Sequence, residues 1–479
     1  MIKRVQSVVS RNVQALRQRG SFAQNFAVAF SGTAAVAAIG FLVTPVMSRI
    51  YPPSSYGLFA VFNSIVANAT LFSTLTYQNA FLLPRLRERF HALVHLSFGL
   101  SVLMLVVMSS AVALWRAPLL HLLNAEELGN WVYVVPATVF VYNLVMIMHA
   151  WYLRTKDFAK RAGTDVGTSL VGRGLTLGVG YMLHGSPTGL LLGDVFTKAS
   201  SFLLLFFSGI HRQVREVAST FSWQRIRSVA HEYREYPFYV MPTAYLNTLA
   251  SQLPILVLTS SFGTTAVGLY AFSTSLLELP INLIGNAIAP VFLQKANETY
   301  EQEPERLKQL CLDLYNKLFY LGLLPFGILS IFGDWIFKLA FGARWEQAGL
   351  FTAFLGYYYV FKLASYATGP IYAVFRKQGT VLLGTILLVL ARAASLYIGT
   401  RQHDLNLGML LFGISSLVVT FLIDMHILRL LKLPVWRVAL RSIALVLLTL
   451  ALLTGIRRVL STDAVQQRWQ VFYEQYWPK

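Results

Sequence analysis

The chain has 479 residues, of which 56% are hydrophobic and 13% are charged, and its mean hydropathy is +0.56. A soluble chain of this length and composition would have too little polar surface, so its solvent must be the lipid bilayer. The formal net charge of +19 would suit nucleic acid, but the basic residues lie in connectors between apolar segments, and we expect no nucleic-acid partner. The single cysteine, Cys311, excludes a disulfide framework within the chain.

The N-terminal segment 1–23 is basic, and the apolar run after it is too long for the core of a signal peptide. We therefore expect a cytoplasmic N-terminus. Twelve apolar segments of about 20 residues follow, each long enough to cross a bilayer as an α-helix. Their predicted bounds are 24–47, 57–82, 92–114, 131–153, 164–183, 188–209, 237–261, 265–292, 310–333, 348–370, 379–400 and 405–427.

The connectors alternate between rich and poor in Lys and Arg. On one side every predicted connector is basic, whereas the opposite side carries only Arg49, Arg116, Lys338, Arg344 and Arg401. Because basic loops stay in the cytoplasm, this pattern predicts a multi-pass protein of the bacterial inner membrane.

The longest basic connector, 210–236, separates six predicted spans (24–209) from six more (237–427), which favours two lobes. It predicts either an amphipathic helix on anionic headgroups or a solvated linker. The remaining segment, 428–479, contains the apolar stretch Ser442–Ile456, which either crosses as a thirteenth span or lies in the interface. The predicted fold class is an all-α polytopic membrane protein with 12 core helices.

Charged residues inside the predicted spans are the candidates for function, because each costs several kcal/mol in lipid unless it meets a partner or a water-filled cavity. Four are cations: Arg173, Lys198, Lys362 and Arg392. Two are carboxylates at comparable depth: Asp194 and Glu278.

The excess of positive charge inside the spans suits an anionic ligand such as a phosphate or diphosphate. Asp194 and Lys198 stand four residues apart, so a local ion pair with no role in transport is the alternative for them. Arg392 and Lys362 either line a cavity or extend towards the interface. In the fifth span, Gly174 and Gly178 have GxxxG spacing, which favours close helix packing or bending. We find no metal-binding or ATP-binding motif.

The first two spans carry a specific pattern. It consists of Gly40-Phe41-Leu42-Val43-Thr44-Pro45, Ser48-Arg49-Ile50-Tyr51-Pro52, Tyr56-Gly57-Leu58-Phe59 and Tyr77-Gln78-Asn79-Ala80-Phe81. Together with Leu279–Ile288 and the external segment Phe341–Gly349, this pattern resembles the polysaccharide-biosynthesis flippases of the Wzx type. That family belongs to the multidrug/oligosaccharidyl-lipid/polysaccharide (MOP) exporter superfamily.

The resemblance implies two six-helix bundles around a central cavity, as in MATE transporters, and a transporter rather than an enzyme. It implies an undecaprenyl-diphosphate-linked oligosaccharide as cargo, moved from the cytoplasmic to the periplasmic leaflet by alternating access. A polysaccharide polymerase and a chain-length regulator would be partners, besides membrane lipids. No cofactor is expected, but Asp194 or Glu278 would bind H⁺ or Na⁺ if an ion gradient drives the cycle.

Three polar residues of the resembling motifs have two interpretations each. Arg49 is either a gate or a structural cap at the outer end of the first span, and Gln78 and Asn79 either bind sugar hydroxyls or join helices. A MATE-type multidrug exporter and a lipid II flippase of the same superfamily remain the alternative functions. The glycan could be O-antigen of lipopolysaccharide, capsule or exopolysaccharide.

Overall fold

The computed structural model describes residues 22–122, 124–155 and 157–461. Within them, the chain forms helices joined by turns and no β-strand. The long α-helices are α2 (Phe22–Ile50), α3 (Pro53–Thr74), α4 (Arg87–Leu122), α5 (Val135–Arg154), α6 (Phe158–Met182), α7 (Pro187–Phe207), α10 (Met241–Pro280), α11 (Asn286–Gln302), α12 (Pro304–Phe341), α13 (Glu346–Val374), α14 (Gln378–Arg401), α15 (Leu405–Leu430) and α16 (Val435–Leu460).

Shorter helical segments connect these elements. They are η1 (Tyr77–Leu82), η2 (Glu126–Val134), η3 (Ile210–Arg212), α8 (Val214–Ser219), α9 (Trp223–Glu232), η4 (Tyr236–Val240), η5 (Ile281–Gly285) and η6 (Ala343–Trp345). Two of them, η4 and η5, are π-helical turns next to the ends of α10. η4 contains Pro237 and η5 directly follows Pro280, and a proline removes an amide donor from the regular hydrogen-bond ladder.

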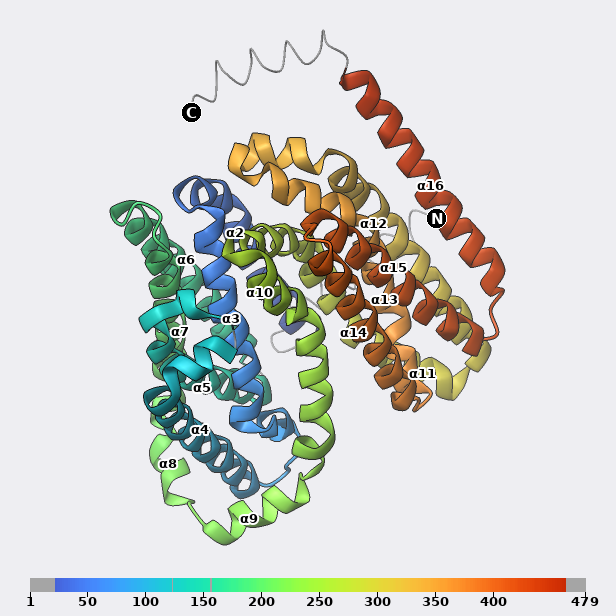
Figure 1. The fold of residues 1–479 in the computed structure, drawn as a ribbon. Coiled ribbons are helices and arrows are strands. Elements are labelled where there is room, and N and C mark those ends of the chain that lie inside the picture. The colour runs from blue at the N-terminus through green and yellow to red at the C-terminus, as the bar shows by residue number, and fades with distance from the viewer. Residues whose placement is uncertain (1–21, 123, 156, 462–479) are drawn as a thin grey trace. The chain divides into compact units, whose positions relative to one another are not determined.

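The chain divides into two compact units (Figure 1). In the first unit, which comprises 1–51 and 58–249, α6 packs against both α2 and α7, and α5 packs against α4 and α7. In the second unit, which comprises 52–57 and 250–479, α13 packs against α11, α12 and α15, and α14 pairs with α15. The predicted linker 210–236 lies within the first unit.

Ten helical stretches among the described residues are long and apolar enough to cross a membrane. One of them, Tyr236–Gln302, covers both the seventh and the eighth predicted spans. Inside it, Gly263 has φ +77° and breaks the helical path of α10 between the two predictions. The fifth and tenth predicted spans correspond to α6 and α13, which are helical but are not among these ten stretches. The count of twelve spans therefore stays a prediction.

The second span ends earlier than predicted, at Thr74 rather than residue 82. Leu75 and Thr76 adopt positive φ values of 48° and 61°, which an α-helix cannot accommodate. The chain then forms the separate 3₁₀ turn η1. Gln78 and Asn79 therefore stand on a connector and not on the spanning helix.

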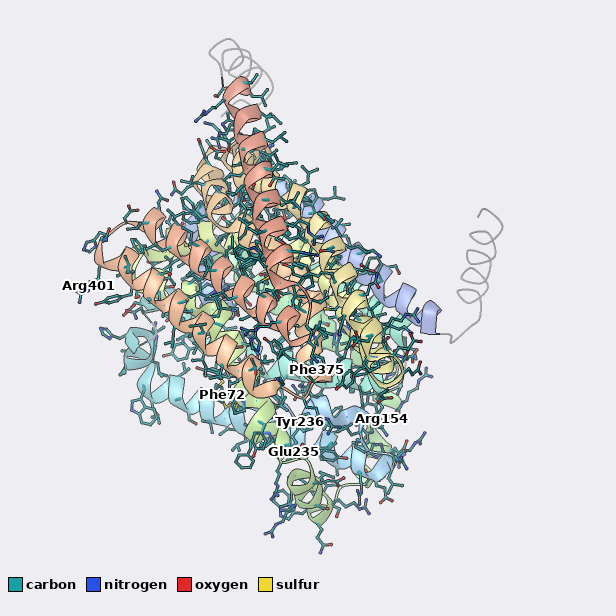
Figure 2. The ribbon with its side chains drawn as sticks, turned by 90° about the vertical axis from the view of Figure 1, so that its right-hand side faces the viewer. Phe72, Arg154, Glu235, Tyr236, Phe375 and Arg401 are labelled. Carbon is teal, nitrogen blue, oxygen red and sulfur yellow. The ribbon has the colours of Figure 1, made fainter. Side chains whose placement is uncertain are left out.

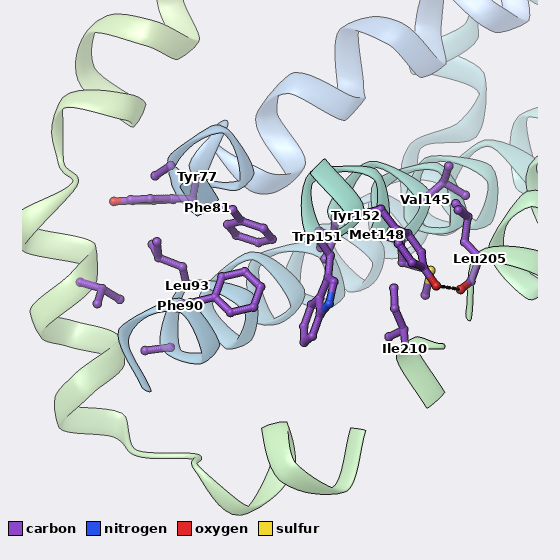
Figure 3. Close-up of a cluster of buried hydrophobic side chains, with 14 of the residues drawn as sticks. Tyr77, Phe81, Phe90, Leu93, Val145, Met148, Trp151, Tyr152, Leu205 and Ile210 are labelled. Atoms are coloured by element: carbon purple, nitrogen blue, oxygen red, sulfur yellow. Dashed lines mark hydrogen bonds between the residues drawn. The ribbon is translucent and has the colours of Figure 1, made fainter. Parts of the chain in front are cut away.

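The basic connector after α7 packs against its own unit rather than extending as a free linker. Ile226 and Val229 of α9 are buried in a cluster with residues of η1, α4, α5 and α7. The rings of Phe90 and Trp151 pack edge-on within this cluster, with their centroids 4.8 Å apart (Figure 3). The hydroxyl of Tyr152 donates to the carbonyl of Leu205 at 2.9 Å.

Hydrogen bonds from side chains to backbone carbonyls surround this cluster and fix its connectors. Arg154, at the end of α5 (Figure 2), donates to the carbonyls of Phe81 at 2.6 Å and Pro84 at 2.7 Å. The Tyr77 hydroxyl donates to the carbonyl of Ala230 at 3.0 Å, and burial raises the pKa of this hydroxyl, which keeps it a neutral donor. Trp223 of α9 stays 72% exposed, so one face of the connector remains available to solvent or lipid headgroups.

The C-terminal apolar stretch forms a longer helix than Ser442–Ile456. α16 has 26 residues, and it qualifies by length and composition as a membrane span. It includes Arg437 and Arg441 before the predicted apolar stretch and Arg457 and Arg458 after it. Long basic side chains lie along helix ends with their charged heads at the interface, so they extend the helix without preventing it from spanning.

Candidate functional site

The motif residue Tyr51 fills a gap between two glycines in the first unit. Its side chain is fully buried, and its hydroxyl donates to the carbonyl of Thr176 at 2.6 Å. A Cβ atom at Gly180 or Gly189 would lie 2.2 or 2.1 Å from that hydroxyl oxygen. Tyr51 therefore ties the end of α2 to α6 and α7, and its role is packing.

The glycines with GxxxG spacing are not the ones that allow this packing. Added Cβ atoms at Gly174 and Gly178 would meet no atom within 4 Å. On the same helix a Cβ at Gly172 would lie 1.8 Å from Oγ1 of Thr197 on α7. Close approach in α6 thus depends on Gly172 and Gly180.

Two motif segments far apart in sequence meet within the second unit. The Tyr56 ring contacts the fully buried Trp345 edge-on, with the ring centroids 5.1 Å apart. Next to Tyr56, a Cβ at Gly57 would lie 1.7 Å from the carbonyl oxygen of Thr264. These motifs therefore hold the start of α3 against α10 and η6.

The first unit places Lys198 and Asp194 in an ion pair on one face of α7. Their side chains are 12% and 18% exposed, and the Lys198 ammonium lies 5.5 Å from the ring centroid of Tyr142 on α5. The i,i+4 spacing predicted this pair, whereas no spacing in the sequence indicated Tyr142. Whether Lys198 also binds substrate stays a prediction.

Arg173 lies against the backbone of α2. Its Nε donates to Oγ of Ser169 at 3.4 Å, and a Cβ at Gly40 would lie only 2.8 Å from Nη2. The absence of a side chain at Gly40 thus lets the guanidinium rest on α2. Arg173 is half-buried, so a polar ligand that reached this side of the helix would meet a delocalised cation.

In the second unit, Glu278 of α10 and Lys362 of α13 form an ion pair. The Tyr359 hydroxyl donates to the same Glu278 oxygen, Oε1, at 2.9 Å. The Lys362 ammonium lies 4.9 Å from the centroid of the Tyr359 ring. About a third of each charged side chain is exposed, at 29% for Lys362 and 32% for Glu278.

Arg392 of α14 is the most deeply buried of the four predicted cations, at 6% exposure. Its Nε donates to Ser416 Oγ at 2.9 Å, its Nη1 to the carbonyl of Ala250 at 2.9 Å, and its Nη2 to Tyr358 Oη at 2.8 Å. The guanidinium also lies 4.9 Å from the ring centroid of Phe412. These contacts join four helices, so the geometry suits a structural role, and its assignment to substrate binding stays a prediction.

The remaining predicted site residues lie outside these groups. Arg49 is exposed in the last turn of α2, where a cation interacts favourably with the helix dipole. Gln78 is half-buried on η1, and its Oε1 has no hydrogen-bond partner among the described residues. Asn79 is exposed on the same turn.

The sequence interpretation gave no role to two other carboxylates. Asp165 lies 3.6 Å from His149 of α5 and 3.9 Å from Arg161. Asp424 of α15 is fully buried against Ser365 and Thr368 of α13. Arg161 and Asp165 share a face of α6 at i,i+4 spacing, which is a signal that the sequence interpretation did not use. The contacts of Asp165 with His149 and of Asp424 with α13 join different helices, and such contacts leave no spacing signal.

Each unit thus contains a lysine, a carboxylate and a tyrosine in one cluster. The carboxylate holds the lysine in place and neutralises its charge. A phosphate group could displace the carboxylate from the ammonium, because both groups are anions that accept hydrogen bonds from it. The tyrosine rings add apolar faces of the kind on which sugars stack. Across the described residues, no group of three or more His, Cys, Asp or Glu side chains could hold a metal ion.

The fold resembles that of solved membrane transporters. A multidrug resistance MATE family transporter of the MOP superfamily, in an inward-facing conformation, aligns with a TM-score of 0.64 and 16% identity over 88% of this chain and 98% of its own. Lipid II flippase MurJ, in an inward closed conformation, aligns with a TM-score of 0.67 and 11% identity over 91% of this chain and 93% of its own. The expected MATE-like fold is therefore confirmed.

Sequence comparison gives a curated relative and a family. The succinoglycan biosynthesis transport protein ExoT of Rhizobium meliloti (strain 1021) is 21% identical over 310 residues, or 64% of this chain. The match spans 60% of that relative's length. A family model described as polysaccharide biosynthesis protein matches residues 46–349, which contain most of the motifs described above. The protein is a multi-pass membrane protein that belongs to this polysaccharide biosynthesis family.

Proposed function

We propose that this protein is a flippase that moves an undecaprenyl-diphosphate-linked oligosaccharide from the cytoplasmic to the periplasmic leaflet. Its membership in the polysaccharide biosynthesis family carries the proposal. Two further likenesses support it, one to a succinoglycan transport protein and one in fold to a lipid II flippase. The proposed site is the inner membrane, with the N-terminus in the cytoplasm and the basic connectors on the same side.

The proposed cycle is alternating access. The sugar and the diphosphate travel through a polar interior while the polyprenyl tail remains in lipid, because a hydrocarbon tail gains nothing from leaving the bilayer. Solved MATE transporters of this fold include inward-facing and outward-facing conformations, which supports a two-state cycle. Each conformation would expose the headgroup to one leaflet.

Basic residues inside the spans would contact the diphosphate. The guanidinium of Arg173 is planar and permanently charged, and it can donate two parallel hydrogen bonds to phosphate oxygens. Lys198 and Lys362 would exchange their carboxylate partners for the diphosphate, and the freed Asp194 and Glu278 would then accept a proton or Na⁺. Such an exchange gives a physical basis for coupling to an ion gradient, because the carboxylates become available only when substrate binds.

A multidrug exporter is the second candidate, and the fold likeness to a MATE transporter favours it. An exporter of cationic drugs needs accessible carboxylates. Asp194 and Glu278 each contact a lysine instead, which makes both sites less attractive to a cation. We therefore prefer an anionic cargo.

A deletion in the native host tests the proposed function. Deletion should abolish one surface glycan (O-antigen, capsule or exopolysaccharide), while the complete lipid-linked repeat unit accumulates with its sugars facing the cytoplasm. Plasmid-borne wild-type protein should restore export, and the host's drug sensitivity should not change. Unaltered glycan with altered drug sensitivity would instead establish the exporter. Co-purification with a polysaccharide polymerase and a chain-length regulator would test the proposed partners.

A further inference from the structure

Asp424 is the carboxyl group that this fold buries most completely among those in the membrane-spanning helices described. Its exposure is 0%, and it stands on α15 facing two hydroxyl groups of α13. Asp194 and Glu278 each meet a lysine, but within the described residues no Lys, Arg or His lies within ion-pair distance of Asp424. A buried carboxylate with no cation is costly, and a neutral carboxylic acid avoids that cost.

The hydrogen-bond inventory around Asp424 also favours the neutral acid. Ser365 Oγ lies 3.0 Å from Oδ2 of Asp424 and 2.9 Å from the carbonyl of Phe361. Thr368 Oγ1 lies 2.5 Å from Oδ1 and 3.2 Å from the carbonyl of Ser365. Two hydroxyl protons therefore face four acceptor contacts, because each hydroxyl carries one proton. A proton on the carboxyl group supplies a third donor.

The titratable neighbours do not supply a compensating charge. Cys311 and Tyr315 of α12 and Tyr372 of α13 are the groups near enough to interact with the carboxyl. All three are neutral acids in their ordinary state. On α15 itself, His426 stacks on Tyr372 at 6.3 Å between centroids, and Arg441 of α16 donates to Asn316.

We propose that Asp424 is a proton-binding site whose occupancy controls the contact between α13 and α15. In the packing described, the proton bridges one oxygen of Asp424 to one of the two hydroxyls of α13, and the other hydroxyl donates to the other oxygen. On deprotonation the O–H bond breaks, the electron pair stays on the carboxylate, and the proton passes to water. The resulting charge needs hydration, so α13 and α15 must separate locally to admit water. Proton binding itself is independent of the proposed function; its coupling to transport rests on that function.

Infrared spectroscopy of the purified full-length protein in lipid tests proton binding without any transport assay. At near-neutral pH, wild-type protein should show the carbonyl stretch of a protonated, buried carboxylic acid, and the band should disappear in one step as the pH rises. Asp424→Asn should lack this band. The matched control is Asp313→Asn, because Asp313 is exposed near the start of α12 and should leave the band unchanged.

Each outcome decides the proposal. The proposal is overturned if the band persists in Asp424→Asn. It is also overturned if Na⁺ removes the band at constant pH and K⁺ does not, because the site would then bind sodium. If Asp424→Asn does not fold, Thr368→Val in otherwise wild-type protein should shift the frequency of the band, and an unshifted band overturns the assignment. In cells, Asp424→Asn should export at a rate that no longer varies with external pH; export that retains wild-type pH dependence contradicts the coupling while leaving the flippase function intact.

Discussion

Arg457 of α16 donates to Asp334 of α12, with Nη2 and Oδ2 2.5 Å apart. At the other end of the same two helices, Arg441 donates to Oδ1 of Asn316. The two arginines are separated by about 24 Å along α16, at 1.5 Å per residue. α16 therefore runs parallel to α12 over most of the thickness of a hydrocarbon core, as a thirteenth spanning helix would.

Site-specific labelling should place the C-terminal end of α16 on the side of the membrane opposite to the basic connector. In a Cys311→Ala background, Ser461→Cys should react with a membrane-impermeant maleimide added from the periplasmic side. Gln402→Cys, at the predicted external end of α14, should react in the same way, and Gln213→Cys in the basic connector should react only after the membrane is permeabilised. If Ser461→Cys behaves like Gln213→Cys, α16 does not span.

The two ends of α16 show what the sequence could predict. The apolar stretch Ser442–Ile456 predicted a segment that either crosses as a thirteenth span or lies in the interface. Arg441 and Arg457 belong to the helix because Asn316 and Asp334 of α12 accept their hydrogen bonds. Such partners lie more than a hundred residues away in the chain, and hydrophobic periodicity carries no information about them.

The same reasoning separates the two lysine–carboxylate pairs. Asp194 and Lys198 share one helix face, so their spacing predicted the contact. Glu278 and Lys362 stand on α10 and α13, and only the folded chain brings them together. Charge at membrane depth was therefore predictable from hydropathy, whereas the pairing between helices depended on packing.

Arg392 and Arg173 should respond differently to substitution. Arg392→Ala removes three hydrogen bonds to buried oxygen atoms, and we expect it to destabilise the protein by about 3 kcal/mol or more. Arg392→Lys should recover little of this loss, because one ammonium does not reach all three acceptors in the fork geometry. The effect can be measured as a change in the temperature at which the protein in detergent unfolds, detected as the loss of monodisperse protein.

Arg173→Ala should leave thermal unfolding nearly unchanged and reduce glycan export at least tenfold, and Arg173→Lys should retain more export than Arg173→Ala. This split distinguishes a ligand contact from a structural one. Equal losses of stability for Arg173→Ala and Arg392→Ala would assign both arginines to packing. Full export by Arg173→Ala would show that Arg173 does not belong to the proposed site.

Glu278 and Lys362 should show strong coupling in a double-mutant cycle. Lys362→Met leaves a partly buried carboxylate without its cation, and Glu278→Gln leaves the ammonium without its anion, so each single variant should lose about 1–2 kcal/mol of stability. The double variant should be more stable than either single variant, because neither charge remains. Export should stay low in Lys362→Met and in the double variant, which both lack the ammonium, if Lys362 contacts the diphosphate. Additive stability losses would show that the pair does not interact, and wild-type export by the double variant would exclude a role in transport.

Gly180 and Gly178 offer a matched pair on α6 for the packing of the motif residue Tyr51. Gly180→Ala places a Cβ 2.2 Å from the Tyr51 hydroxyl oxygen, in a contact that also includes the rigid ring. The ring must move, its hydrogen bond to the carbonyl of Thr176 is lost, and we expect a destabilisation of about 1–3 kcal/mol. Gly178→Ala meets no atom within 4 Å and should be neutral or stabilise the helix by up to about 1 kcal/mol.

Removing the hydroxyl by Tyr51→Phe should relieve part of the Gly180→Ala clash. If both alanine variants unfold at the same temperature, Gly180 is not the residue that admits Tyr51 between α6 and α7.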